Sequence, residues 1–273
     1  MKTKLTEEGT KIPEDENKKL WRYLNIWKFI DLLSTSKLHF TRVDKIKEDE
    51  PFDSKYPDKI YEILKKNLIE INKFNDKQAS MDAKVWRRFD TVIDKLFFIN
   101  CWNISDHESA AMWKIYTQEN KGIAIQTTYK KLMHSIEKKG IMAGLVEYID
   151  HNTLKFDDGN LLSYGSNGAY NHCFLKHISY NYEKEFRLGY ASHDKKYIKG
   201  INYETKTSKG TYASDIREFI KIPIIDLNNL IENIYASPFM DSWQIEILNI
   251  LLHKFRINKK IQYSELYYKE LKD

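Results

Sequence analysis

The chain has 273 residues, of which 42% are hydrophobic and 30% are charged, with a formal net charge of +5. A chain of this length buries roughly 70–75% of its unfolded surface, so it needs no disulfide or metal to hold a core. The mild basic excess is compatible with a phosphate-bearing ligand. It lacks the concentrated basic stripe that is typical of a DNA-coating protein.

The cysteines and the N-terminus indicate a cellular compartment. Cys101 and Cys173 lie far apart, and neither has the CxxC partner of a structural zinc site. They predict reduced, buried thiols. The first residues contain no apolar run, which predicts no signal peptide, and no stretch of ~18 apolar residues predicts a membrane span. We expect a cytoplasmic protein without a membrane partner.

The predicted elements begin after a polar segment. Residues 1–19 mix acids and bases with few apolar side chains, which predicts a mobile or loosely docked arm before a single domain at 20–273. Leu20–Tyr23 predicts a short strand. Asn25 is expected to cap a helix whose apolar positions over 26–33 follow helical spacing.

Further along the chain, strands and helices alternate irregularly. Strands are expected over 37–42, 96–102, 122–127, 141–149, 182–190, 219–225 and 234–238, and helices over 60–71, 81–96, 109–116, 132–136, 226–231 and 243–255. A charged loop is expected at 44–58. Irregular alternation favours an α+β fold, with a central mixed or antiparallel sheet and flanking helices, over a doubly wound parallel sheet.

The segment with the most specific chemistry is Tyr182–Arg187, which reads Tyr-Glu-Lys-Glu-Phe-Arg. On a strand, Glu183, Glu185 and Arg187 project from one face. Two carboxylates about 7 Å apart along a strand suit sugar-bond chemistry. One can stabilise an oxocarbenium-like cation while the other orients or deprotonates an acceptor. The alternative interpretation is a solvated strand face with a Glu–Arg pair.

Aromatic side chains accompany an arginine on the first predicted strand. Arg22 is flanked by Trp21 and Tyr23. Guanidinium groups bind phosphate as a planar fork, and aromatic rings offer stacking faces for a base or a nicotinamide. We therefore assign Arg22, Tyr23, Trp102 and Trp113 to a cofactor site together with Arg187. For Trp113, core packing is the alternative.

An early arginine, a middle strand and a late Glu-x-Glu, in that order, resemble the arginine–serine–glutamate class of ADP-ribosyltransferases. The resemblance implies NAD as the substrate. It assigns Arg22 to the dinucleotide, Glu185 to the ribose and the transition state, and Glu183 to the acceptor. That class has Ser-x-Ser at the start of the middle strand, where this chain reads Asn-Cys-Trp-Asn over 100–103. One of the three anchors of the class is therefore absent.

Motifs over about residues 20–270 resemble the bacterial domain-of-unknown-function family 2971 (DUF2971). They are Leu20–Tyr23, Leu38–Arg42, Glu50–Asp53, Cys101–Asn103, Glu108–Tyr116, Gly122–Ile125, Tyr182–Arg187 and Tyr235–Pro238. The third motif usually begins with Asp, where this chain has Glu50. The family brings no established activity. Relatives of this kind look like accessory or defence-associated proteins, which suits a toxin-like enzyme.

Three hypotheses follow. The first is an ADP-ribosyltransferase-like enzyme that cleaves the nicotinamide–ribose bond of NAD and passes ADP-ribose to a macromolecule or to water, with no metal expected. The second is a non-catalytic nucleotide- or nucleic-acid-binding module, sensor or antitoxin-like, in which Arg22, Arg42 and Arg187 contact phosphates. The third is a metal-dependent nuclease that uses the acids at 44–58. Metal binding around His172 and His177 is disfavoured because the sequence places no acid nearby.

Overall fold

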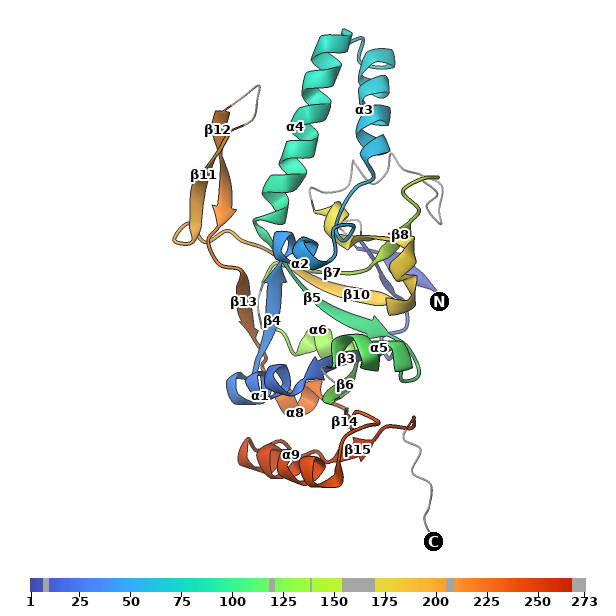
Figure 1. Ribbon diagram of the computed structural model, residues 1–273, viewed down its shortest axis with the longest axis vertical. Helices are drawn as coiled ribbons and strands as arrows, with labels where there is room; N and C mark the ends of the chain where they lie inside the picture. Colours follow the sequence, from blue (N-terminus) through green and yellow to red (C-terminus); the bar gives the residue numbers. More distant parts are fainter. Residues whose placement is uncertain (7–9, 118–120, 138, 154–169, 205–208, 267–273) are drawn as a thin grey trace.

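A nine-stranded sheet forms the centre of the molecule in the computed structural model, which describes residues 1–6, 10–117, 121–137, 139–153, 170–204 and 209–266 (Figure 1). In the order in which they pair, the strands are β13 (Phe219–Pro223), β4 (Lys37–Arg42), β5 (Phe97–Ile104), β3 (Lys19–Asn25), β6 (Gly122–Thr128), β14 (Asn233–Ala236) and β15 (Ile261–Tyr263), with β10 (Glu185–Ala191) and β7 (Ile141–Leu145) joined through β5. Neighbouring strands are antiparallel except for β14 and β15, so the sheet is mixed. The predicted α+β class is confirmed.

Helices and short sheets surround this centre. The helices are α1 (Ile26–Thr35), α2 (Val43–Asp49), α3 (Asp58–Glu70), α4 (Asp76–Asp94), α5 (Ala110–Tyr116), α6 (Tyr129–His134), α8 (Leu227–Leu230) and α9 (Ser242–Lys254), with 3₁₀ turns η2 (Asn171–Phe174) and η3 (Ile178–Glu183). The two-stranded sheets pair β1 (Thr3–Leu5) with β2 (Lys11–Pro13), β8 (Glu147–Ile149) with β9 (Leu175–His177), and β11 (Ile198–Glu204) with β12 (Lys209–Asp215). Helices α3 and α4 extend together away from the sheet, and α9 lies at the opposite end of the molecule (Figure 1).

Strand β5 is buried along almost its whole length, as its largely apolar sequence predicts. Phe97 and Phe98 project to opposite faces and are fully buried in two different core clusters. On the neighbouring β10, Phe186 and Leu188 pack into the larger cluster. Covering both faces of β5 fixes the register in which β10 presents its polar side chains.

The sheet contains a gap beside β5 that positions the site. One edge of β5 pairs with β10 along its length. The other edge is shared: β4 pairs with Phe98 and Ile99, whereas β3 pairs with Asn103 and Ile104. The residues between them, at 100–102, have no strand partner on that edge within the described chain. Strands β3 and β4 therefore diverge around the middle of β5.

Three segments differ from the sequence-based expectations. In place of a loosely docked arm, β1 and β2 form a hairpin whose Thr10 hydroxyl donates to the Ala143 carbonyl at 2.6 Å. Helix α2 occupies the first half of the expected loop at 44–58. A β11–β12 hairpin lies in a stretch for which no element was predicted, because its residues lack a clear two-residue period.

Candidate functional site

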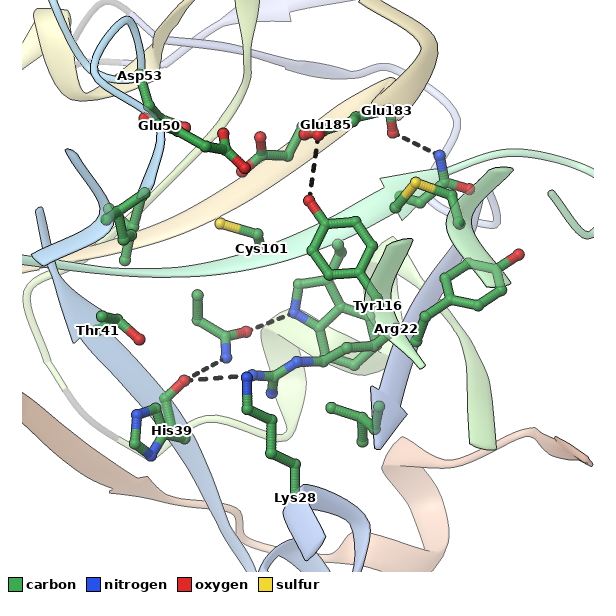
Figure 2. A pocket seen from close by; sticks show the side chains of 18 of the residues that line it. Arg22, Lys28, His39, Thr41, Glu50, Asp53, Cys101, Tyr116, Glu183 and Glu185 are labelled. Atoms are coloured by element: carbon green, nitrogen blue, oxygen red, sulfur yellow. Dashed lines mark hydrogen bonds between the residues drawn. The ribbon is translucent and has the colours of Figure 1, made fainter. Parts of the chain in front are cut away.

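A cavity of about 340 Å³ lies over the gap between β3 and β4. Its floor is the unpaired part of β5, and β3, β4, α2, α5 and the start of β10 contribute its walls. Figure 2 shows that charges of opposite sign gather on its two sides: Glu50, Asp53, Glu183 and Glu185 on one, and Arg22 with Lys28 on the other.

Arg22 is the main cation on the basic side. Its Nη2 donates to the His39 carbonyl at 3.3 Å, and its guanidinium lies 5.8 Å from the centre of the Trp102 ring. Within the described residues it has no carboxylate partner. Burial lowers the pKa of Arg22 to about 10, and burial followed by the charges of Arg22 and Lys28 lowers the pKa of His39 to about 4. An incompletely solvated guanidinium without a counter-ion favours an anionic ligand.

A second cavity, of about 320 Å³, adjoins the first on this side. The two share Arg22, Lys28 and His39 among their lining residues. Trp27 and Phe219, which are 74% and 49% exposed, line the second cavity only. Each cavity falls in the usual size range of ligand sites, about 300–1,000 Å³. Two cations, Arg22 and Lys28, therefore line both cavities.

The two glutamates of the Glu-x-Glu segment lie on the acidic side, although they do not share a strand as predicted. Glu183 ends η3, Lys184 adopts a left-handed conformation (φ 41°), and Glu185 begins β10. The turn at Lys184 places both side chains in the cavity wall, where they are 2% and 5% exposed. The expected alternation holds from Glu185 onward, with Arg187 on the same face.

Two buried cations hold these carboxylates. Arg187, which is inaccessible to solvent, donates to both oxygens of Glu185 at 2.6 and 2.9 Å and to Asp53 at 2.6 Å. Lys176 donates to Glu183 at 2.6 Å. Arg187 and Lys176 together outweigh the effect of burial and lower the pKa of Asp53.

Glu183 is held differently from Glu185. Its Oε1 accepts a hydrogen bond from the Tyr116 hydroxyl at 3.2 Å. Burial, reinforced by the nearby charges of Glu185 and Glu50, raises the pKa of Glu183 to about 7 despite the opposing effect of Lys176. Burial also raises the pKa of Tyr116, so its phenol remains a hydrogen-bond donor. A carboxyl that titrates near neutrality is suited to move a proton.

The structure brings together most of the residues assigned from the sequence. Arg22, Tyr23, Trp102, Glu183 and Glu185 line the cavity.

Two of the assigned residues do not line it. Arg187 lies behind the wall, where its guanidinium is saturated by carboxylates and by the Cys173 carbonyl. Trp113 packs edge-on against Tyr23 at 5.0 Å and donates to Glu108, which is the core-packing alternative. Arg42, which the second hypothesis required, is bound to Asp44 through two hydrogen bonds.

Sequence reasoning missed Lys176, which no motif marks, and Asn100. The Asn100 side chain bridges the gap in the sheet, since it donates to the His39 carbonyl and accepts from Trp102, both at 2.7 Å. It lies within the Asn-Cys-Trp-Asn segment that replaces the Ser-x-Ser of the transferase class. The position of that segment on the middle strand was the one sequence signal that could have pointed to Asn100.

The expectation that no acid lies near His172 is wrong, because the fold brings an acid that is distant in the sequence next to it. Asp94 Oδ1 lies 3.0 Å from His172 Nε2, and Cys173 Sγ lies 3.6 Å from the same nitrogen. These three groups are buried close together and have the ligand types of a metal site. Asp94 also pairs with Lys47 at 2.6 Å, so its charge is balanced by protein groups.

The comparisons with known proteins concern the part of the chain that contributes Glu183 and Glu185 to the acidic side of the cavity. A family model described as a protein of unknown function (DUF2971) matches residues 112–188, so the predicted resemblance is confirmed over that segment. Glu183, Glu185, Arg187 and Trp113 lie inside it, whereas Arg22 lies outside. No curated protein and no solved structure matches the chain.

Among the helices that the structure describes, none combines the length and the apolar character that crossing a bilayer demands.

Proposed function

We propose that the cavity binds NAD or a related pyridine dinucleotide and that the protein cleaves its nicotinamide–ribose bond, passing ADP-ribose to a macromolecule or to water. The observation that carries the proposal is the charge polarity of one cavity. Arg22 lies on one side without an ion pair in the described chain, and Glu183 and Glu185 lie on the other. NAD has the same polarity, because its diphosphate is anionic and its nicotinamide ring is cationic.

The carboxylate side also suits the reaction. Four carboxylates, from Glu50, Asp53, Glu183 and Glu185, face two buried cations, so this wall keeps negative charge. Glu185, whose two carboxylate oxygens both accept hydrogen bonds from Arg187, would stabilise the oxocarbenium-like ribose as the bond between C1′ and the nicotinamide nitrogen breaks. The electron pair leaves with nicotinamide and neutralises the ring. The acceptor then bonds to C1′ and gives its proton to Glu183.

Arg22 and Lys28, at the junction of the two cavities, would bind the diphosphate. Trp102 and Tyr23 would bound the nicotinamide side, and Trp27 with Phe219 would offer stacking faces to the second base. A role as a toxin or defence effector belongs to this proposal, since it rests on the resemblance to DUF2971, whose relatives look like accessory or defence-associated proteins.

The test is NAD consumption by the purified protein, with cell lysate supplied as acceptor. We expect Glu185→Gln to lower turnover by about 100–1,000-fold, because a group that stabilises transition-state charge is removed. Glu246→Gln is the matched control, since Glu246 is exposed on α9, and it should retain wild-type turnover. Full turnover in Glu185→Gln would overturn the mechanism, and absence of both turnover and NAD binding in the wild type would overturn the function.

A non-catalytic nucleotide-binding module is the second candidate. It is favoured by the ion pairs that already occupy Glu183 and Glu185. Of its three proposed phosphate ligands, only Arg22 is left without a carboxylate partner in the described chain, because Arg42 and Arg187 are engaged. On this hypothesis, nucleotide binding would fall with salt and survive both Glu→Gln changes. Chelation would separate either candidate from a metal-dependent nuclease acting through Glu50 and Asp53.

A further inference from the structure

Lys176, on the short strand β9, lies at the centre of the carboxylate wall. Its Nζ is 2.6 Å from Glu183 Oε2 and 2.6 Å from Glu50 Oε2, and it is 3.3 Å from Asp53 Oδ2 and 3.7 Å from Glu185 Oε2. Four acids from two segments of the chain, 50–53 and 183–185, therefore converge on one ammonium group. The lysine is 2% exposed.

Backbone contacts, in addition to the ion pairs, hold these groups together. Asp53 and Lys176 form an isolated antiparallel bridge, and the Ser54 amide donates to the Leu175 carbonyl at 2.9 Å. These contacts join the Glu50–Asp53 segment to β9. They explain why Glu50 and Asp53, which take no step of the proposed reaction, lie against the site.

The ammonium is the only side-chain cation in direct contact with Glu183 within the described residues, because Arg187 is turned toward Glu185 and Asp53. The carboxylates of Glu183 and Glu185 lie 2.6 and 3.7 Å from the same Lys176 ammonium. Two carboxylates so placed would repel each other, and the shared cation offsets that repulsion. A purely structural ion cluster would need no such link to a cavity wall, yet Lys176, Glu183 and Glu185 all line the cavity.

We propose that Lys176 is a positioning residue for the reaction: its ammonium is the resident counter-ion that holds Glu183 and Glu185 in their working orientation and sets the proton affinity of Glu183. The catalytic part of this inference rests on the proposed function. The effect on Glu183 does not, because it is a property of the unliganded site.

Two substitutions should shift the titration of Glu183 in opposite directions. Lys176→Met removes the cation, so the pKa of the Glu183 carboxyl should rise by at least about one unit. Glu50→Gln removes a neighbouring negative charge that raises this pKa, so the pKa should fall. Lys176→Arg keeps the charge and should leave the pKa closer to that of the wild type than Lys176→Met does.

The experiment follows the carboxyl signals of ¹³C-glutamate-labelled protein through a pH titration, with Glu183 assigned by the signal lost in Glu183→Gln. Lys47→Met is the matched control, since Lys47 forms a comparable, partly buried pair with Asp94 outside the cavity. It should leave the Glu183 titration unchanged. Because Glu50→Gln removes no cation, it keeps the test available if Lys176→Met does not fold.

NAD turnover provides the second readout. Lys176→Met should lower kcat by about 100-fold, as displaced catalytic groups do, with little change in KM, and move the limb of the pH–rate profile assigned to Glu183 to higher pH. Lys176→Arg should recover part of kcat. If the pKa of Glu183 is unchanged in Lys176→Met, the inference is overturned even if NAD is cleaved. If Lys176→Met does not fold, an unchanged pKa of Glu183 in Glu50→Gln has the same consequence. Shifted titrations without NAD cleavage in the wild type would overturn the proposed function and leave the electrostatic role of Lys176 standing.

Discussion

At the scale of single residues, arginines that look equivalent in the sequence have different roles. Arg187 is enclosed by Asp53 and Glu185 and neutralises them. Arg22 lies at a cavity with only a weak contact to a carbonyl. Removing one partner of a buried ion pair leaves an uncompensated charge, so substitution of Arg187 reports on stability first. Arg22 is the arginine whose substitution can report on a ligand.

Glu183 gives a pH-dependent prediction at this scale. Its folded-state pKa of about 7 lies above the ordinary value of 4.5, so the folded state holds this proton more tightly than the unfolded state does. Stability from this group is present at pH 4.5 and is lost as the pH rises toward 7. Glu183→Gln cannot ionise, so it should be more stable than the wild type by about 1–3 kcal/mol at pH 8, and the difference should shrink near pH 4.5.

Urea unfolding at the two pH values measures this difference. Glu246→Gln, on the exposed face of α9, is the control and should show no pH-dependent difference from the wild type. Lower stability of Glu183→Gln at pH 8 would contradict a raised pKa and indicate a Glu183 that is ionised and stabilising.

At the scale of elements, local patterns predicted the parts that local interactions determine. The Asn25 cap of α1, the helix at 110–116 after Ser109, and the strands β4, β5 and β6 all form as their sequences indicate. The helix periodicities also predicted α3 and α4, but Met81, Val85 and Phe89, which share one apolar face of α4, are exposed. Periodicity identifies an apolar face without identifying what covers it.

Helix α1 offers a prediction because it carries Lys28 to the cavity. The Asn25 side chain accepts from the Lys28 amide at 2.9 Å and caps the helix. Asn25→Ala should lower the free energy of unfolding by about 1 kcal/mol, whereas Asn25→Asp, which can still accept this bond, should differ from the wild type by much less. Denaturant unfolding of the three proteins is the measurement, and equal losses in both variants would show that the cap does not stabilise α1.

At the scale of the whole molecule, the site is formed by strands distant in sequence. The sequence analysis assigned Arg22, Glu183 and Glu185 to one site from their residue types and order, and all three line one cavity. It did not identify the gap beside β5 or Lys176. The gap arises because β3 and β4 pair with different halves of one strand, and Lys176 reaches the glutamates through β9 and the Glu50–Asp53 segment. Both depend on long-range pairing, which a single sequence does not reveal.

The charge polarity of the cavity can be tested without turnover. Calorimetric titration should show that NAD and ADP-ribose bind, since both carry the diphosphate that Arg22 and Lys28 would contact, and that binding weakens with added salt. Arg22→Met should reduce both affinities by at least tenfold, because hydrogen bonds to a charged group contribute about 1.5–3 kcal/mol. Arg87→Met, at an exposed pair with Asp58 on the distant α3–α4 arm, is the control. Loss of affinity in Arg22→Met alone is the result that we predict. Equal affinity in the wild type and Arg22→Met would contradict a dinucleotide site in this cavity.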